Sequence, residues 1–127
     1  MKLLLVLADD DSSYRALIRN WLKASGEIKV VGEASDGGEA VAKTLTLQPD
    51  AVLMDISMPV LNGIEATRQI MAGRPDTMVI GLSIHADKQF KEEMFAAGAR
   101  AYILKENLVS ELLPVLRSLV GEAPPLA

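Results

Sequence analysis

Five short apolar runs alternate with helical patterns along the chain, and the runs show no regular alternation of polar and apolar residues. A half-exposed strand shows that alternation, whereas a strand in a parallel sheet is covered on both faces and is apolar throughout. Five such units in series imply right-handed crossovers and helices on both sheet faces. The runs are Leu3–Leu7, Ile28–Val31, Ala51–Met54, Met78–Leu82 and Ala101–Leu104. The sequence therefore predicts an α/β fold with a five-stranded parallel sheet.

Capping residues and glycines mark the first four helices. Ser12 and Ser13 are expected to cap the first helix, which ends before Gly26. Its inner face is expected to contain Tyr14, Leu17, Ile18, Trp21 and Leu22. Capping boxes are indicated for the second and third helices by Asp36 with Glu39 and by Asn62 with Glu65. A fourth helix is expected from about Asp87 to Ala97, stopping at Gly98.

The fifth helix contains a proline, which limits where the helix can begin. Pro114 would break a helix started at Asn107. A start near Ser110 places Pro114 in the first turn, where no backbone N–H is needed. We therefore expect a start near Ser110, with Leu112, Leu116, Leu119 and Val120 facing the core.

Composition limits the class of protein. The chain has 127 residues, half of them hydrophobic, which suits one domain over residues 1–121, with residues 122–127 as a tail or the start of a linker. The net charge of −4 gives no basic footprint for nucleic acid, and the absence of cysteine excludes disulfides and thiolate metal sites. The first apolar run is shorter than the ~18 residues of a spanning helix. It leads into acids rather than a signal cleavage site, so we expect a cytoplasmic protein without a membrane segment.

Ionisable and hydroxyl side chains stand at the ends of the apolar runs. They are Asp9 and Asp10 after the first run, Asp55 after the third, Ser83 after the fourth and Lys105 after the fifth. Ligands of open parallel sheets bind beyond the carboxyl ends of the strands, so these side chains are expected to meet at one edge. A carboxylate at the end of a buried strand is costly to desolvate without a partner. The group suggests a Mg²⁺ site around a carboxylate that can be phosphorylated, although helix capping by the acids remains an alternative.

Several short motifs occur in order around these residues. They are Ala8-Asp9-Asp10, Met54-Asp55-Ile56-Ser57-Met58-Pro59, Asn62-Gly63, Ser83, Gly98-Ala99, Tyr102 and Leu104-Lys105. Each motif alone is weak, but together, at these spacings, they make residues 2–121 resemble the receiver domain of two-component response regulators. The resemblance implies a flavodoxin-like three-layer sandwich with strand order 2-1-3-4-5 and five helices.

The resemblance also implies roles for individual residues. Asp55 matches the phosphoacceptor, whose carboxylate would form an acyl phosphate. By the same analogy Mg²⁺ is bound by Asp10, Asp55 and the backbone carbonyl of Ser57, with Asp9 acting through water. Lys105 matches the lysine that contacts the phosphoryl group.

A second set of implied roles concerns switching. Ser83 matches the hydroxyl that donates to a phosphoryl oxygen, and Tyr102 matches an aromatic residue that then moves inward. In receivers the position of His85 lines the phosphoryl pocket, although His85 could equally be an exposed loop residue. The implied partner is a sensor histidine kinase, and the surface of the fourth helix, fifth strand and fifth helix would change partners or form a homodimer. We expect no direct nucleic-acid binding by this segment.

Two positions depart from the family pattern. Many receivers have proline after the lysine, often with a cis peptide, whereas Glu106 follows Lys105 here. A non-proline cis bond costs ~2.5–4 kcal/mol, so a trans bond is expected. The Leu-Lys-Glu sequence looks like the branch whose receivers precede a helix-turn-helix DNA-binding domain. Ile84 replaces a small residue, and we hypothesise that it narrows access to Asp55.

Three other functions remain open. A pseudo-receiver would be an interaction module without phosphotransfer, but the complete residue set argues against it. A metal-dependent phosphohydrolase often needs a second acid near its nucleophile, and position 57 is serine. A flavin-binding module is disfavoured by the low aromatic content. We therefore expect a phosphoryl carrier that hydrolyses its own phosphoryl group, and no multiple-turnover enzyme.

Overall fold

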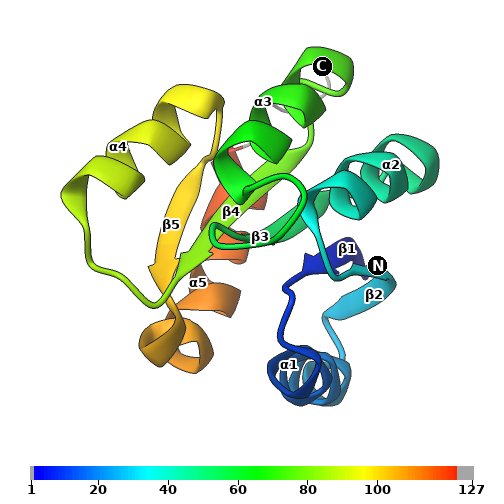
Figure 1. The fold of residues 1–127 in the computed structure, drawn as a ribbon. Helices are drawn as coiled ribbons and strands as arrows, with labels where there is room; N and C mark the ends of the chain where they lie inside the picture. The colour runs from blue at the N-terminus through cyan, green and yellow to red at the C-terminus, as the bar shows by residue number, and fades with distance from the viewer. Residues whose placement is uncertain (1, 123–127) are drawn as a thin grey trace.

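Five parallel strands form the middle layer of the fold, in the order β2-β1-β3-β4-β5, as predicted (Figure 1). The computed structural model describes residues 2–122. The strands are β1 (Leu3–Ala8), β2 (Ile28–Ala34), β3 (Ala51–Asp55), β4 (Met78–Ser83) and β5 (Ala101–Leu104). The helices are α1 (Ser12–Ser25), α2 (Gly37–Leu47), α3 (Gly63–Gly73), α4 (Lys88–Ala97) and α5 (Leu108–Glu122), with a 3₁₀ turn at Lys105–Asn107.

The helices cover both faces of the sheet, which completes the predicted three-layer sandwich (Figure 1). Helices α2, α3 and α4 pack on one face and bury side chains such as Ala40, Ile70 and Met94. Helices α1 and α5 pack on the other face through side chains such as Leu22 and Leu112. Since alternate residues of a strand point to opposite faces, every side chain of the central strand β3 is buried.

The predicted capping residues act at two helices, and a different residue acts at a third. Side-chain oxygens of Asp36 and Asn62 accept from the backbone N–H groups three residues on, at 2.8 and 2.9 Å. The prediction for α1 was wrong by one residue. Asp11, rather than Ser12, is the N-cap, and its Oδ1 accepts from the backbone N–H groups of Ser13 and Tyr14 at 3.0 and 3.1 Å. A carboxylate suits this position because it also complements the helix dipole.

The predicted start of α5 was also wrong. The helix begins at Leu108, directly after the 3₁₀ turn, and Pro114 lies inside it. Leu108, Leu112 and Leu116 are 1%, 0% and 2% exposed and form one stripe at four-residue spacing. Burial of Leu108 therefore favours the early start. Pro114 lies on the exposed side, where solvent can bond the carbonyl that the proline leaves without its helical partner.

The apolar faces of α1 and α5 are narrower than the sequence suggested. Leu17 is 65% exposed and Val120 is 51% exposed, whereas both were expected to face the core. Each lies beside a stripe of buried residues rather than in it. The tail was predicted to begin at residue 122, but Glu122 is the last residue of α5. The rest of the predicted tail, residues 123–127, lies outside the described residues. Within residues 2–122, no helix has the length and apolar character needed to cross a membrane.

Candidate functional site

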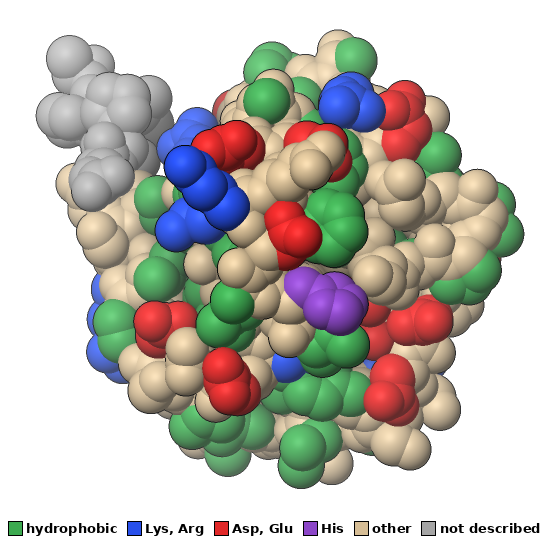
Figure 2. Space-filling view, turned by 60° about the vertical axis from the view of Figure 1, so that its left-hand side comes forward, with side chains coloured by type: hydrophobic (Ala, Val, Ile, Leu, Met, Phe, Trp, Pro, Cys, Tyr) green, Lys and Arg blue, Asp and Glu red, His purple; other side chains and the backbone are tan. Residues whose placement is uncertain are grey.

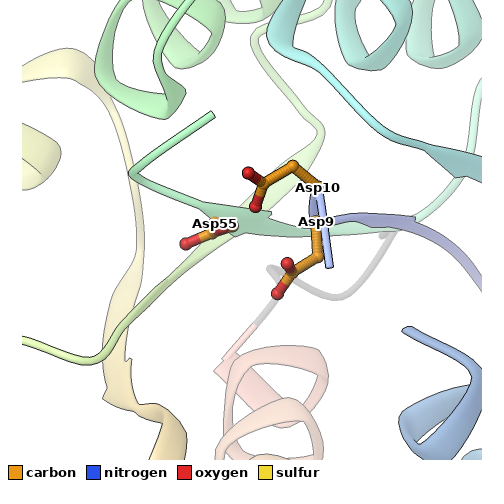
Figure 3. A group of neighbouring side chains, drawn as sticks. All are labelled: Asp9, Asp10 and Asp55. Carbon is orange, nitrogen blue, oxygen red and sulfur yellow. The ribbon is translucent and has the colours of Figure 1, made fainter. Parts of the chain in front are cut away.

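Three carboxylates meet at the carboxyl edge of the sheet (Figure 3). Asp9 and Asp10 follow β1, and Asp55 is the last residue of the neighbouring strand β3. One carboxylate oxygen from each lies within 4.8 Å of the others. Asp9 and Asp55 are buried, at 0% and 4% exposure, while Asp10 is exposed. We call Asp9, Asp10 and Asp55 the acidic cluster.

The surroundings of Asp55 make its ionised form costly. Burial, together with the charges of Asp9 and Asp10, raises the pKa of Asp55 to about 7, although the Lys105 charge and a hydrogen bond from the Ser57 backbone act to lower it. Near neutral pH the carboxyl therefore lies close to its titration point. A second positive charge beside it would favour the ionised, nucleophilic form.

The ammonium group of Lys105 lies beside the acidic cluster. Its Nζ lies 2.8 Å from Oδ2 of Asp9 and 3.7 Å from Oδ2 of Asp55, and its side chain is 17% exposed. Burial lowers the pKa of Lys105, but the hydrogen bond to Asp9 and the charges of Asp55, Asp9 and Asp10 raise it above its usual value overall. The lysine is therefore a fixed ammonium between two buried acids.

The backbone that follows Asp55 is packed tightly against β4 and the start of α3. Asp55 pairs with Leu82 in the β3–β4 ladder, and the Ile56 N–H donates to the Leu82 carbonyl at 3.1 Å. The first residue of α3, Gly63, packs on this turn, and its N–H donates to the Ile56 carbonyl at 2.8 Å. A Cβ at Gly63 would lie 2.2 Å from the Asp55 carbonyl oxygen. Asn62 therefore caps α3, as predicted, and Gly63 allows the close approach of the helix to the Asp55 backbone.

Ser83 and Tyr102 are linked through one backbone segment. Ser83 is 2% exposed, and its Oγ accepts from the His85 N–H at 2.9 Å. The Tyr102 hydroxyl donates to the His85 carbonyl at 2.8 Å. The His85 side chain is exposed and contacts the Phe90 ring, with centroids 6.1 Å apart. It is the purple side chain in Figure 2, which shows charged and hydrophobic side chains mixed over this face. The β4–α4 loop therefore connects the two predicted switch residues.

The residues of the acidic cluster fit a hard divalent cation. Mg²⁺ prefers oxygen ligands, and the cluster provides carboxylates at short mutual distance. The buried Oδ2 of Asp9 has no hydrogen-bond partner among the described residues apart from its ion pair with Lys105. Three acids therefore share one ammonium, which leaves negative charge uncompensated. Asp9, Asp10 and Asp55 could hold the metal, and binding by the Ser57 carbonyl stays a prediction.

The two departures from the family pattern have different outcomes. No cis peptide bond occurs among residues 2–122, so the predicted trans bond between Lys105 and Glu106 is confirmed. Ile84 is 71% exposed, so most of its side chain faces solvent. Its effect on access to Asp55 stays a hypothesis.

Two residues of α1 belong to the site but were given no role in it from the sequence. The Tyr14 ring lies against Lys105, with Nζ 4.6 Å from the ring centroid. Arg15 donates through Nη1 to the Asp9 carbonyl at 2.6 Å and through Nε to Glu33 at 3.1 Å. Burial, together with the charges of Asp9 and Asp55, raises the pKa of Tyr14 to about 12. Their position one turn after the acid pair is the sequence signal that could have found them.

Fold and site together define a flavodoxin-like α/β protein with a lysine-containing acidic site at the carboxyl edge of its sheet. The family model of the response regulator receiver domain matches residues 5–117, and the chain belongs to this family. The transcriptional regulatory protein DegU of Brevibacillus brevis is 36% identical over 116 residues, which are 91% of this chain and 49% of DegU. The chain spans about half the length of the curated relatives it matches.

Solved structures show the same fold. The response regulator domain of Thermotoga maritima CheB has a TM-score of 0.89 and 33% identity, and the match covers 98% of this chain and 100% of that one. The CheX-CheY-BeF3-Mg²⁺ complex from Borrelia burgdorferi matches with a TM-score of 0.84 and 26% identity, covering 93% of this chain and 89% of that one. The flavodoxin-like fold class is thus confirmed.

Proposed function

We propose that this receiver domain accepts a phosphoryl group from a histidine kinase onto Asp55, in a reaction that requires Mg²⁺. The observation that carries the proposal is Asp55 itself. It is a buried carboxylate whose pKa is raised to about 7, 3.7 Å from an ammonium and within 4.8 Å of two further acids. The similar CheY structure is named as a complex with Mg²⁺ and BeF3, which supports the same use of this edge of the sheet.

In the proposed reaction, a carboxylate oxygen of Asp55 attacks the phosphorus, and the bond from phosphorus to the donor nitrogen breaks. Such a transfer mainly needs in-line positioning and compensation of charge on the phosphoryl oxygens. Lys105 supplies one positive charge beside the attacking oxygen. When bound to the acidic cluster, Mg²⁺ supplies further neutralisation of the phosphoryl oxygens. Water later cleaves the acyl phosphate, which releases inorganic phosphate and restores the Asp55 carboxylate. We propose that the domain carries the phosphoryl group between these two steps and is not a multiple-turnover enzyme.

The proposed output begins at the β4–α4 loop. Ser83 already bonds the His85 N–H, and Tyr102 bonds the His85 carbonyl. A phosphoryl oxygen that attracts the Ser83 hydroxyl would compete with the first bond and shift the loop. The surface of α4, β5 and α5 would then change its partner or form a homodimer, a shift between two populated states. We extend the proposal to a DNA-binding output in the cytoplasm, because relatives such as DegU are named as transcriptional regulatory proteins.

The direct test is incubation with acetyl phosphate and Mg²⁺, followed by intact mass measurement. The wild-type chain should gain the mass of one phosphoryl group, and the Asp55→Asn variant should gain none. Asp76→Asn is the matched control, because the Asp76 side chain is 79% exposed and lies outside the acidic cluster. It should be phosphorylated like the wild type.

Two outcomes would contradict the proposal. A wild-type chain that gains no phosphoryl group with any small donor would favour the pseudo-receiver. Equal gain by the Asp55→Asn variant would place the phosphoryl group elsewhere. Light scattering on the phosphorylated sample would report whether it forms a dimer.

A further inference from the structure

Tyr14 contacts the lysine of the site in two ways. Nζ of Lys105 lies 4.6 Å from the centroid of the Tyr14 ring, within the range of a cation–π interaction. The Tyr14 hydroxyl donates to the backbone carbonyl of Lys105 at 3.4 Å, a long hydrogen bond. One side chain from α1 therefore holds both the ammonium and the backbone of a residue that follows β5. The two residues are 91 positions apart in the sequence.

This contact matters because a lysine side chain is otherwise poorly fixed. Its ammonium is a point charge on a flexible stem of four carbons, and its position depends on what surrounds it. Here Asp9 and Asp55 lie within 2.8 and 3.7 Å of Nζ, and the half-buried Tyr14 ring lies within 4.6 Å. The Lys105 side chain is consequently only 17% exposed.

We propose that Tyr14 is a positioning residue that confines the ammonium of Lys105 beside Asp55 and so sets the rate of phosphoryl transfer. The inference rests on the proposed function. Tyr14 contacts Lys105 and is not one of the carboxylates that could hold the metal, so in this proposal it acts through the lysine. It should therefore affect the rate of transfer without weakening Mg²⁺ binding. A general structural role in α1 would instead loosen the end of β1 and weaken both.

Three substitutions distinguish the effects of the ring contact and the hydroxyl contact with Lys105 from the effect of packing in the core. Tyr14→Phe keeps the aromatic face and removes the hydroxyl, whereas Tyr14→Leu removes both. Trp21→Leu is the matched control, since Trp21 is a half-buried aromatic residue of α1 that packs against the same core about two turns further on. The control should lower stability and leave phosphorylation unchanged.

The first measurement is the initial rate of phosphorylation by acetyl phosphate at saturating Mg²⁺, with Mg²⁺ affinity measured by calorimetry. Tyr14→Leu should lower the rate about three- to tenfold, the factor expected from a partly desolvated cation–π contact. Tyr14→Phe should stay within about twofold of the wild type, because it keeps the ring. In a Lys105→Met background, Tyr14→Leu should have no further effect. An equal loss in both backgrounds, or a parallel loss of Mg²⁺ affinity, would overturn the inference.

The second measurement does not depend on phosphorylation. Brief labelling with acetic anhydride, read by peptide mass, reports how accessible each lysine is. Tyr14→Leu should raise labelling of Lys105 several-fold relative to Lys88, an 88% exposed internal reference. Unchanged labelling would overturn the inference even if the wild type were never phosphorylated. A wild type that shows the labelling change but gains no phosphoryl group would contradict the proposed function and leave the Tyr14–Lys105 contact established.

Discussion

Two neighbouring charge clusters are linked through Asp9, and the pKa values of their central carboxylates are shifted in opposite directions. In the acidic cluster, three acids share the single ammonium of Lys105. In the second group, which we call the Glu33 cluster, one acid on β2 binds two guanidinium groups, Arg15 at 3.1 Å and Arg19 at 2.7 Å. Arg15 joins the clusters by donating to the Asp9 carbonyl.

The difference appears in the pKa values. Burial would raise the pKa of Glu33, but hydrogen bonds and charges from Arg19 and Arg15 lower it below its usual value. Burial raises the pKa of Asp55 to about 7, and Lys105 only partly opposes this. The two arginines therefore compensate the charge of Glu33, whereas the single lysine does not compensate the charges around Asp55. A satisfied carboxylate stabilises the fold, whereas the unsatisfied one can react or bind a cation.

Removing the ammonium should produce the largest effect. Lys105→Met leaves the fully buried Asp9 without its ion-pair partner, and breaking a buried pair in this way costs several kcal/mol. We expect a loss of about 2–4 kcal/mol in the free energy of unfolding at pH 8, measured by urea denaturation without divalent cations. Mg²⁺ should recover part of this loss. Lys91→Met, at an exposed lysine of α4, is the control. A loss of stability as small as that of the control would contradict the view that the acidic cluster lacks positive charge.

Asp55→Asn should act in the opposite direction. The folded-state pKa of about 7 lies above the unfolded value near 4, so the folded carboxyl stays protonated where the unfolded one is ionised. The wild type should therefore lose stability as pH rises from about 4 to 7. Asparagine cannot ionise, so the variant should be more stable by roughly 1–3 kcal/mol at pH 8 and equal to the wild type near pH 4.

The measurement is urea denaturation across that pH range in a chelating buffer. Mg²⁺ should narrow the gap at pH 8 because it binds the wild-type cluster more strongly than a cluster with one carboxylate fewer. A gap that does not change with pH would show that the benefit comes from packing, and the raised pKa would then be wrong.

The sequence predicted the sheet and the edge where the site lies because both depend on local pattern. Continuous apolar runs indicate buried parallel strands, and residues such as Asp9, Asp55 and Lys105 follow those runs directly. Parallel strands bring such residues to one edge whatever the details of packing. The site could therefore be located before any side-chain contact was known.

What the sequence did not predict depends on packing between distant elements. The contact of Tyr14 with Lys105 joins α1 to the segment after β5. The position of Tyr14 after the acid pair could place it near the site, but no local pattern identifies Lys105 as its partner. The start of α5 depends on burial of Leu108 against the sheet, which outweighs the local cost of Pro114. Leu17 was assigned to the core because it is apolar, although the sheet covers only the stripe beside it.

The smallest expected effect comes from the Glu33 cluster. Removing the charge of Glu33 should lower the free energy of unfolding, whereas removing that of Asp55 should raise it. Because the folded-state pKa of Glu33 is lowered, its stabilisation is present above the unfolded pKa and is lost as pH falls through the folded value. Glu33→Gln should therefore lower the free energy of unfolding by about 0.5–1 kcal/mol at pH 7, since Arg19 is 43% exposed and the pairs are partly screened. The loss should shrink at high salt and vanish in acid. A Glu33→Gln variant that is more stable than the wild type at pH 7 would show that both clusters lack positive charge, and the contrast between them would fail.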